Sequence, residues 1–175
     1  RLRGGEAYTR RLFGNREELR SLMQESAQGL SSEERTMISR VMDLQALTVR
    51  QVMIPLPQVS LMSAQAPVQE VLRICQERKL TRLPVWDNRD GQRRIIGLVH
   101  LDTLLYQPDL DMASPVIRHV KPALYLEEDL RLEVALRRMQ RSGQRLAIVL
   151  GRDRYEIGVV SLQDVLKTIF GEVSL

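Results

Sequence analysis

A two-fold internal repeat limits what this chain can fold into more than any other feature of its sequence. Two segments, residues 95–105 and 157–166, each run from an apolar stretch through a glycine to a polar position and then into a helical apolar pattern. Their glycines, Gly97 and Gly158, are 61 residues apart. An amphipathic stretch and a short apolar stretch precede each segment: residues 68–79 and 83–86 in the first copy, and residues 130–142 and 146–149 in the second. Such a repeat indicates two copies of one structural unit.

Each copy predicts the order strand, helix, strand, strand, helix. The Asp90-Gly91 pair between two apolar stretches is a strong hairpin signal, and residues 151–154 hold the corresponding place in the second copy. The match between the copies also pairs Arg82 with Arg145, each ahead of a strand. We predict an α+β fold in which two βαββα units pack as a pseudo-symmetric pair, with the sheets facing each other and the helices outside.

The first third of the chain predicts helices. Residues 15–18 and 31–34 both have the pattern of a capping box, which marks a helix start. Residues 48–53 predict one further turn of helix, ending before Pro55. We therefore expect a helical linker arm over residues 1–47, a first repeat over residues 48–112 and a second repeat over residues 113–175.

The composition, 43% hydrophobic and 27% charged, is typical of a soluble globular protein. The net charge of +4 is modest and acids are interspersed with bases, which argues against nucleic-acid binding. No apolar run approaches the roughly 20 residues of a membrane span. A local basic excess at Arg1, Arg3, Arg10 and Arg11 fits either a segment beside a membrane, on its cytoplasmic side, or a solvated tail. Because the chain does not begin with Met, we expect it to be part of a larger protein.

The sequence offers no pattern for metal binding or catalysis. Cys75 is the single cysteine and falls in a helical apolar pattern, so we expect it in the core of a protein from a reducing compartment. His100 and His119 have no partners at metal-ligand spacing, and we expect no metal site. No nucleophile–base signature is present either, so we expect no enzymatic activity.

Ser161 and Asp164 are the strongest candidates for a binding site. They lie where the last predicted strand passes into the last helix, at capping-box spacing. A carboxylate there can accept hydrogen bonds from the paired hydroxyls of a ribose, and a helix N-terminus favours a nearby phosphate. The same residues could serve only to cap the helix, so these two residues alone leave both interpretations open.

The doubled unit, closed by the pattern Gly-x-x-Ser-x-x-Asp, resembles a tandem pair of CBS domains over roughly residues 49–173. Four stretches resemble more narrowly the cytosolic part of the CorC/CNNM family of magnesium and cobalt efflux proteins, also described as hemolysin-like: residues 48–55, 81–85, 146–149, and 158–166 with 170–173. The predicted helical arm resembles the segment that links this family's membrane domain to its CBS pair.

The resemblance implies a regulatory module that binds an adenine nucleotide, ATP or AMP, with or without magnesium. It also implies a homodimer formed through the CBS pair, on the cytoplasmic face of the bacterial inner membrane beside the protein's own membrane domain. By this resemblance Asp164 holds the ribose hydroxyls, and Ser161 lies by the ribose or the α-phosphate. Arg82 pairs with phosphate and Thr81 adds a hydroxyl, although Arg82 could also be an ordinary surface arginine. The residues expected to wall the adenine pocket are Pro84, Ala147 and Val160.

The first repeat departs from this pattern, because His100 replaces the hydroxyl and Thr103 replaces the carboxylate. Asp102 comes one residue early and, at about 100° per helical residue, points elsewhere. We therefore expect one site per chain. Three interpretations stay open: a nucleotide-sensing module of a transporter, a dimerisation module with a decayed nucleotide site, and a free-standing CBS regulator of a partner enzyme. The apolar helical residues expected at a dimer contact are Met53, Leu101, Leu104, Leu105, Val165, Leu166 and Ile169.

Overall fold

The computed structural model describes residues 29–171. The helix expected from residue 15 lies outside the described residues. Within them, the arm is α3, Ser32–Ala46. The Ser31 hydroxyl oxygen accepts a hydrogen bond from the Glu34 backbone N–H at 3.1 Å, which confirms the helix start predicted at residues 31–34. The single turn expected before Pro55 is α4, Val49–Val52.

The first repeat forms a three-stranded sheet with two helices. Its elements are β2 (Met62–Ser63), α5 (Val68–Arg78), β3 (Arg82–Arg89), β4 (Gln92–His100) and α6 (Leu101–Leu105). The strand order is β2-β3-β4, with β2 parallel and β4 antiparallel to β3. Asp90 and Gly91 connect β3 to β4 with φ angles of 53° and 79°, which is the left-handed backbone of the predicted tight turn.

The second repeat forms a four-stranded sheet with order β1-β7-β6-β5. It contains η2 (Val116–His119), β5 (Leu124–Glu127), α7 (Leu132–Ser142), β6 (Leu146–Leu150), β7 (Glu156–Ser161) and α8 (Leu162–Phe170). Its fourth strand, β1 (Ile54–Pro55), comes from the connection before the first repeat, ahead of η1 (Leu56–Gln58). This strand was not predicted from the sequence, because Pro55 favours a break in regular structure. A proline is tolerated here because β1 is an edge strand.

Each repeat is completed by the segment that leads into the other. Ile54, ahead of the first repeat, pairs with Val159 of the second. In return Lys121, ahead of β5, pairs with Leu98 of β4 through backbone hydrogen bonds of 2.9 and 2.8 Å. Residues 48–55, which we assigned to the first repeat, therefore pack on the second. The exchange ties the two repeats together through the backbone.

Gly97 and Gly158 make this exchange possible. A Cβ added at Gly158 would collide with the carbonyl oxygen of Ile54, and one at Gly97 would collide with that of Lys121. Only glycine lets the exchanged segment lie this close to the strand. The repeated glycine that revealed the internal repeat therefore has the same structural role in both copies.

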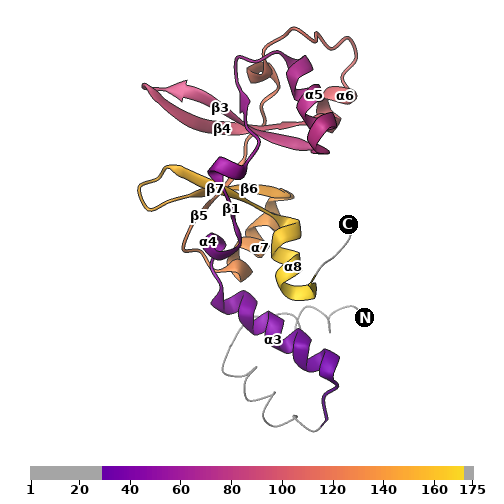
Figure 1. Cartoon of the computed structure of the whole chain (residues 1–175), viewed down its shortest axis with the longest axis vertical. Coiled ribbons are helices and arrows are strands. Elements are labelled where there is room, and N and C mark those ends of the chain that lie inside the picture. Colours follow the sequence, from indigo (N-terminus) through magenta and orange to yellow (C-terminus); the bar gives the residue numbers. More distant parts are fainter. Residues whose placement is uncertain (1–28, 172–175) are drawn as a thin grey trace.

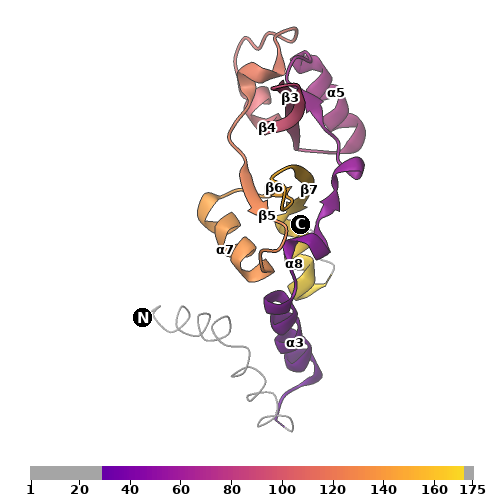
Figure 2. The same ribbon diagram turned by 90° about the vertical axis from the view of Figure 1, so that its left-hand side faces the viewer.

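The two sheets face each other across a buried apolar layer. Its central members are Ile95 and Leu98 of β4, Ile148 of β6 and Val159 of β7. The helices pack on the outer faces of the sheets, over two further apolar clusters. Figure 1 shows this arrangement, with α5 and α6 beyond one sheet and α7 and α8 beyond the other, and Figure 2 shows it from the side. The predicted α+β pair with inward sheets and outward helices is confirmed.

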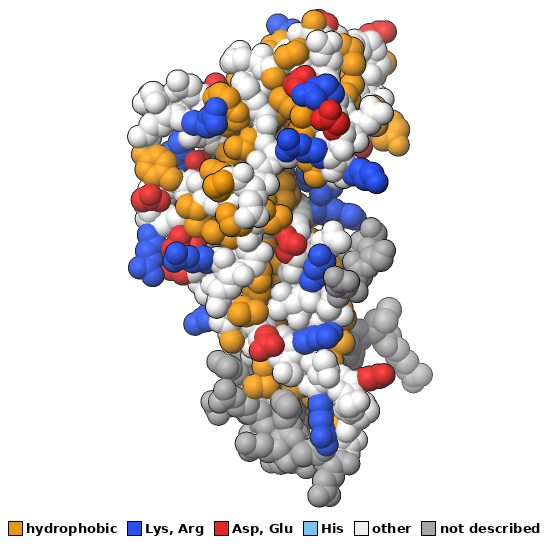
Figure 3. All heavy atoms as spheres, viewed as in Figure 1, with side chains coloured by type: hydrophobic (Ala, Val, Ile, Leu, Met, Phe, Trp, Pro, Cys, Tyr) orange, Lys and Arg blue, Asp and Glu red, His pale blue; other side chains and the backbone are white. Residues whose placement is uncertain are grey.

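The exposed surface mixes apolar side chains with charges of both signs (Figure 3). Three of the residues expected at a dimer contact are instead buried within the chain itself: Leu104, Val165 and Ile169, at 1%, 0% and 6% exposure. They lie on the faces of α6 and α8 that cover the sheets. Leu105 and Phe170, at 66% and 51% exposure, point outward. Among residues 29–171, no helix is long and apolar enough to cross a membrane.

Candidate functional site

A cavity of about 300 Å³ lies where the two repeats meet. It is lined from the first repeat by the end of α5 and the start of β3, and from the second by β6 and β7. The exchanged segment completes it with Ile54 and residues 58–60. Two cationic side chains, Lys79 and Arg82, are in the lining, and no carboxylate is. A ligand in this cavity would contact both repeats at once.

The cavity brings together four of the seven residues predicted for the site. They are Thr81, Arg82, Pro84 and Ser161. A fifth, Asp164, is outside the lining but is hydrogen-bonded to Ser161 in the first turn of α8. The residues of the Thr81-Arg82 stretch and of the Ser161 turn therefore meet across the repeat interface, although about 80 positions separate them in the chain.

Ala147 and Val160 do not line the cavity, contrary to the sequence expectation. Both have 0% exposure and belong to the apolar cluster under the helices of the second repeat. The reason is the two-residue alternation of a strand, which turns neighbouring side chains to opposite faces. Leu146 and Val159, one position away, face the cavity instead. If the face to which one residue of the strand points had been known, the alternation would have shown from the sequence which side chains face the cavity.

Ser161 and Asp164 form a reciprocal capping box at the start of α8. The Asp164 backbone N–H donates to Ser161 Oγ at 3.0 Å, and the Ser161 N–H donates to Asp164 Oδ2 at 3.2 Å. The capping role that the sequence left open is therefore real. The capping box leaves one further hydrogen-bonding group on each of the two side chains. Among the described residues Asp164 Oδ1 accepts no hydrogen bond, and the Ser161 hydroxyl keeps its own proton to donate.

Arg82 occupies a strongly positive part of the cavity wall. It is half-buried, and this burial is the main cause that lowers the pKa of its guanidinium. Repulsion from Arg145 lowers that pKa further. Asp102 opposes this lowering with an attraction. Across the β3–β4 ladder Arg82 is the direct partner of His100. The pKa of His100 is lowered too, chiefly by burial and then by Arg82. An anion would relieve the electrostatic repulsion at this point.

The backbone contacts correct one detail of the repeat alignment. The carbonyl oxygen of Thr81 accepts from the first helical N–H after β4, and that of Arg145 accepts from the first after β7, both at 2.9 Å. Thr81 is therefore the structural counterpart of Arg145. Arg82 corresponds to Leu146, since Arg82 pairs with His100 in the first sheet and Leu146 pairs with Ser161 in the second. The sequence match of Arg82 with Arg145 was wrong by one residue.

The first repeat lacks the capping pair of the second. His100 begins α6 with no side-chain hydrogen bond at the cap, and the Thr103 N–H instead bonds to Asp102 Oδ1 at 2.7 Å. A carboxylate in the position of Asp164 is thus missing, as the sequence indicated. No group of three metal-ligating His, Cys, Asp or Glu side chains occurs within residues 29–171.

Comparison with known proteins gives the family. The CBS domain model matches residues 49–108 and again residues 112–171. Similar proteins include UPF0053 protein YhdT of Bacillus subtilis, 26% identical over 90% of this chain, and Hemolysin C of Brachyspira hyodysenteriae, 25% identical over 82%. These matches span 35% of YhdT and 52% of Hemolysin C, so the chain is shorter than the relatives it resembles.

Solved structures agree with this assignment. The CBS domain of a bacterial CNNM/CorC family Mg²⁺ transporter in complex with ATP is 26% identical, with a TM-score of 0.73 over 81% of this chain and 99% of that one. A second structure of the CBS domain of the bacterial CNNM/CorC family Mg²⁺ transporter superposes over 91% of this chain and 98% of its own with a TM-score of 0.80, at 23% identity. The two model matches together cover more than half of the chain, which therefore belongs to the CBS domain family as a tandem pair, similar to the CBS pairs of CNNM/CorC and hemolysin-like proteins.

Proposed function

We propose that this CBS pair is the adenine-nucleotide-binding regulatory module of a membrane transporter for divalent cations such as magnesium or cobalt. The observation that carries the proposal is the cavity between the repeats. It joins the cationic wall at Arg82 to the polar turn that begins at Ser161 and includes Asp164. A cavity of this size lies at the lower end of the range typical of small-molecule sites.

The two polar parts of the cavity suit the two polar parts of a nucleotide. Asp164 Oδ1 is available to accept a hydrogen bond from a ribose hydroxyl, and the Ser161 hydroxyl can donate to the ribose or the α-phosphate. Arg82, with its fork of N–H donors, suits a phosphate, and Thr81 adds a hydroxyl beside it. Leu146, Val159 and Pro84 offer apolar contacts to the base.

The solved relative that is described in complex with ATP supports this choice of ligand. Magnesium would come with the phosphates, since the described residues offer no cluster of metal ligands of their own. Regulation would follow if the nucleotide stabilises one arrangement of the two repeats, because its site is built from both. The proposed setting is a homodimer on the cytoplasmic face of the bacterial inner membrane, next to the protein's own membrane domain.

Calorimetric titration with AMP, ADP and ATP, each with and without magnesium, tests the proposal. Asp164→Asn removes the charge but keeps an oxygen that can cap Ser161, so it separates ribose binding from helix capping. Loss of a hydrogen bond to a charged group costs roughly 1.5–3 kcal/mol, and we expect affinity to fall about ten- to a hundredfold. Asp164→Ala should in addition lower the melting temperature of the ligand-free protein, because the cap is lost.

Two further variants test whether Arg82 binds the phosphate and whether the first repeat lacks a nucleotide site. Arg82→Ala should weaken ATP more than adenosine, and the ATP loss should shrink at high salt. Thr103→Ala is the matched control in the first repeat and should change neither affinity. Unchanged ATP affinity in folded Asp164→Asn and Asp164→Ala proteins would refute the assignment of the ribose site.

The two remaining interpretations predict different results. A dimerisation module with a decayed site would sediment as a dimer and bind none of the three nucleotides. A free-standing regulator of a partner enzyme would bind nucleotide but would not depend on a membrane domain. The exposed apolar side chains Leu105 and Tyr106, at the end of α6 and just after it, and Phe170, at the end of α8, are available for the dimer contact.

A further inference from the structure

Lys79 occupies a backbone position that suits glycine better than lysine. It follows the last residue of α5, and its φ and ψ angles of 54° and 47° lie in the left-handed region. The N–H groups of Lys79 and Leu80 both donate to the carbonyl oxygen of Cys75, the second at 3.0 Å. These two hydrogen bonds close the end of the helix and hold the backbone in a conformation that residues with a Cβ rarely adopt.

The second repeat has a glycine at the same place. The helices α5 and α7 are both 11 residues long, and α7 also ends at a left-handed residue, Gly143, with φ of 69°. A Cβ added at Gly143 would meet nothing within 4 Å, so a side chain could be accommodated there as well. The two repeats therefore close the same helix end with different residues, and glycine is the more favourable of the two.

The end of the helix by itself does not account for a lysine. A cation near a helix C-terminus complements the helix dipole. However, the last turn of each helix already has an arginine, Arg78 in α5 and Arg141 in α7, and α7 then ends in glycine without a further cation. A residue held in a strained backbone conformation at the edge of a cavity points to a function of its side chain.

The side chain of Lys79 is available to a ligand of the cavity. Lys79 and Arg82 are the two cations in a lining that has no carboxylate. Lys79 is exposed, and within residues 29–171 its ammonium group takes part in no hydrogen bond or ion pair. The neighbouring Arg78, by contrast, donates from Nη1 to Ser60 Oγ of the exchanged segment at 2.5 Å.

We propose that Lys79 determines the phosphate-number selectivity of the cavity, so that it takes adenosine di- and triphosphate in preference to the monophosphate. This inference rests on the nucleotide site proposed above. The fork of Arg82 binds two oxygens of one phosphate, and the ammonium of Lys79 is a point charge for the next. AMP, with a single phosphate, leaves one of these two cations without a partner. The less favourable backbone at Lys79 is the cost of placing an ammonium group at the cavity.

Calorimetric titration of the whole chain with ATP, ADP and AMP, at one free magnesium concentration, tests the proposal. We expect the wild type to bind ATP and ADP more tightly than AMP. Lys79→Gln keeps a polar side chain on the same backbone and removes the charge. It should weaken ATP about tenfold, the low end for a hydrogen bond to a charged group because Lys79 is exposed, and should change AMP by less than about twofold. The ATP loss should shrink at high salt.

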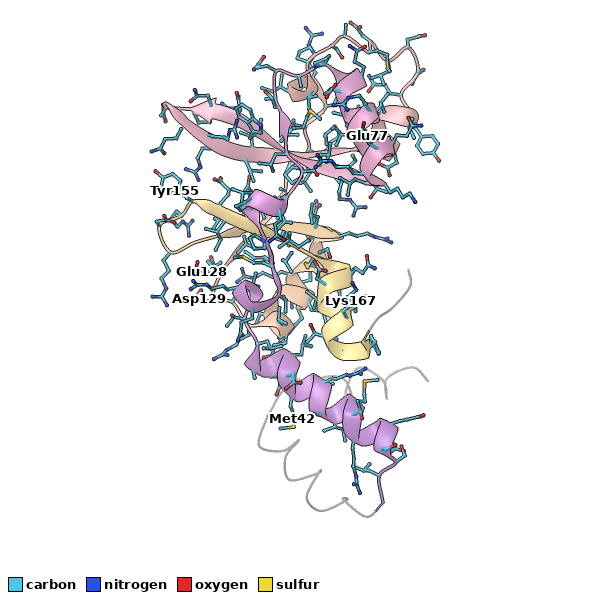
Figure 4. The ribbon with its side chains drawn as sticks, in the orientation of Figure 1. Met42, Glu77, Glu128, Asp129, Tyr155 and Lys167 are labelled. Atoms are coloured by element: carbon cyan, nitrogen blue, oxygen red, sulfur yellow. The ribbon has the colours of Figure 1, made fainter. Side chains whose placement is uncertain are left out.

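Two variants control for charge and chemistry. Lys79→Arg keeps a cation at the same position and should retain most of the preference for ATP over AMP. Lys167→Gln removes one lysine from an exposed position on α8, outside the cavity lining (Figure 4). It lowers the net charge by the same amount as Lys79→Gln and should leave all three affinities within about twofold of the wild type.

Lys79→Gly separates binding from helix capping. Because glycine suits the left-handed backbone, the ligand-free variant should melt at or above the temperature of the wild type. Its ATP affinity should nevertheless fall as in Lys79→Gln. A Lys79→Gly protein that melts at a lower temperature and keeps its ATP affinity would show that the lysine serves the helix end, and would overturn the proposal.

The role of Lys79 and the nucleotide site itself fail in different ways. Asp164→Asn should weaken ATP and AMP by the same factor, since both contain the ribose, whereas Lys79→Gln should change their ratio. If Asp164→Asn weakens both ligands but Lys79→Gln leaves the ratio as in the wild type, the site stands and the role assigned to Lys79 is wrong. If the wild type binds neither ligand, the nucleotide site fails and this proposal fails with it.

Discussion

Arg40 of α3 donates a hydrogen bond from Nη1 to the carbonyl oxygen of Ile169 in the last turn of α8, at 3.4 Å. The helix that begins at the candidate site with Ser161 thus ends against the arm. A cation at a helix C-terminus is favourable, because it satisfies a free carbonyl and complements the helix dipole. In Figure 1, α8 lies between the sheets and α3, so one rigid element connects the site to the arm.

Arg40→Gln should therefore weaken the contact between arm and CBS pair. We expect a loss of about 0.5–1.5 kcal/mol in unfolding free energy, the usual value of one hydrogen bond, measured by urea denaturation. Hydrogen exchange should also show less nucleotide-induced protection of α3 in the variant than in the wild type. Arg35→Gln, an exposed change on the same helix, is the control. Equal protection of α3 in wild type and Arg40→Gln would show that α8 does not couple the site to the arm.

A partly buried ion pair joins the two hairpins. Glu156, with a side chain 5% exposed, accepts from Arg94 Nε at 3.1 Å and from the Ile95 backbone N–H at 3.3 Å. Tyr155, which Figure 4 labels at the β6–β7 hairpin, donates its hydroxyl to Gln92 of β4 at 2.6 Å. Polar contacts at this end of the sheets therefore add to the apolar layer between them.

Glu156→Gln should lower the unfolding free energy by about 1.5–3 kcal/mol, because Arg94 loses its charged acceptor. A double-mutant cycle with Arg94→Gln separates the pair from its surroundings. We expect a coupling energy well above that of an exposed pair such as Arg138 with Glu127, whose atoms are 3.8 Å apart. A coupling energy near zero would mean that the apolar layer alone holds the hairpins together.

Gly158→Ala tests the close approach of the exchanged segment. The added Cβ would collide with the Ile54 carbonyl oxygen, so β1 must shift, at a cost of about 1–3 kcal/mol. Hydrogen exchange should show β1 losing protection first. Gly143→Asn is the control, since Gly143 has φ of 69°, which Asn tolerates, and open space around it. Wild-type stability in Gly158→Ala would contradict the role assigned to this glycine.

Cys75 should react slowly with thiol reagents in the folded protein. It is 2% exposed, and burial raises the pKa of its thiol. The reactive thiolate is therefore disfavoured in the folded state, and reaction should accelerate strongly in urea. Because the folded pKa lies above the unfolded one, stability should fall as pH rises past the unfolded thiol pKa of about 8.5. A Cys75→Ala variant should lose less stability over the same pH interval, and equal losses would contradict the raised pKa.

Sequence alone determined the architecture, because its periodicities are local. The Asp90-Gly91 turn and the amphipathic stretches each reflect short-range backbone and solvent preferences, and their recurrence along the chain gives two βαββα units. The Ser161–Asp164 capping box is local for the same reason. It could be read at a separation of three residues, and the structure contains both of its hydrogen bonds.

Tertiary structure decided the relations between distant segments. Which face of a strand Val159 and Val160 present depends on what packs on each side, and a shift of one residue exchanges the cavity wall for the core. The pairing of Ile54 with Val159 and the repulsion between Arg82 and Arg145 both depend on how one repeat packs against the other. The sequence carries no local signal for such contacts, since their free energy arises only when both repeats are folded and packed together.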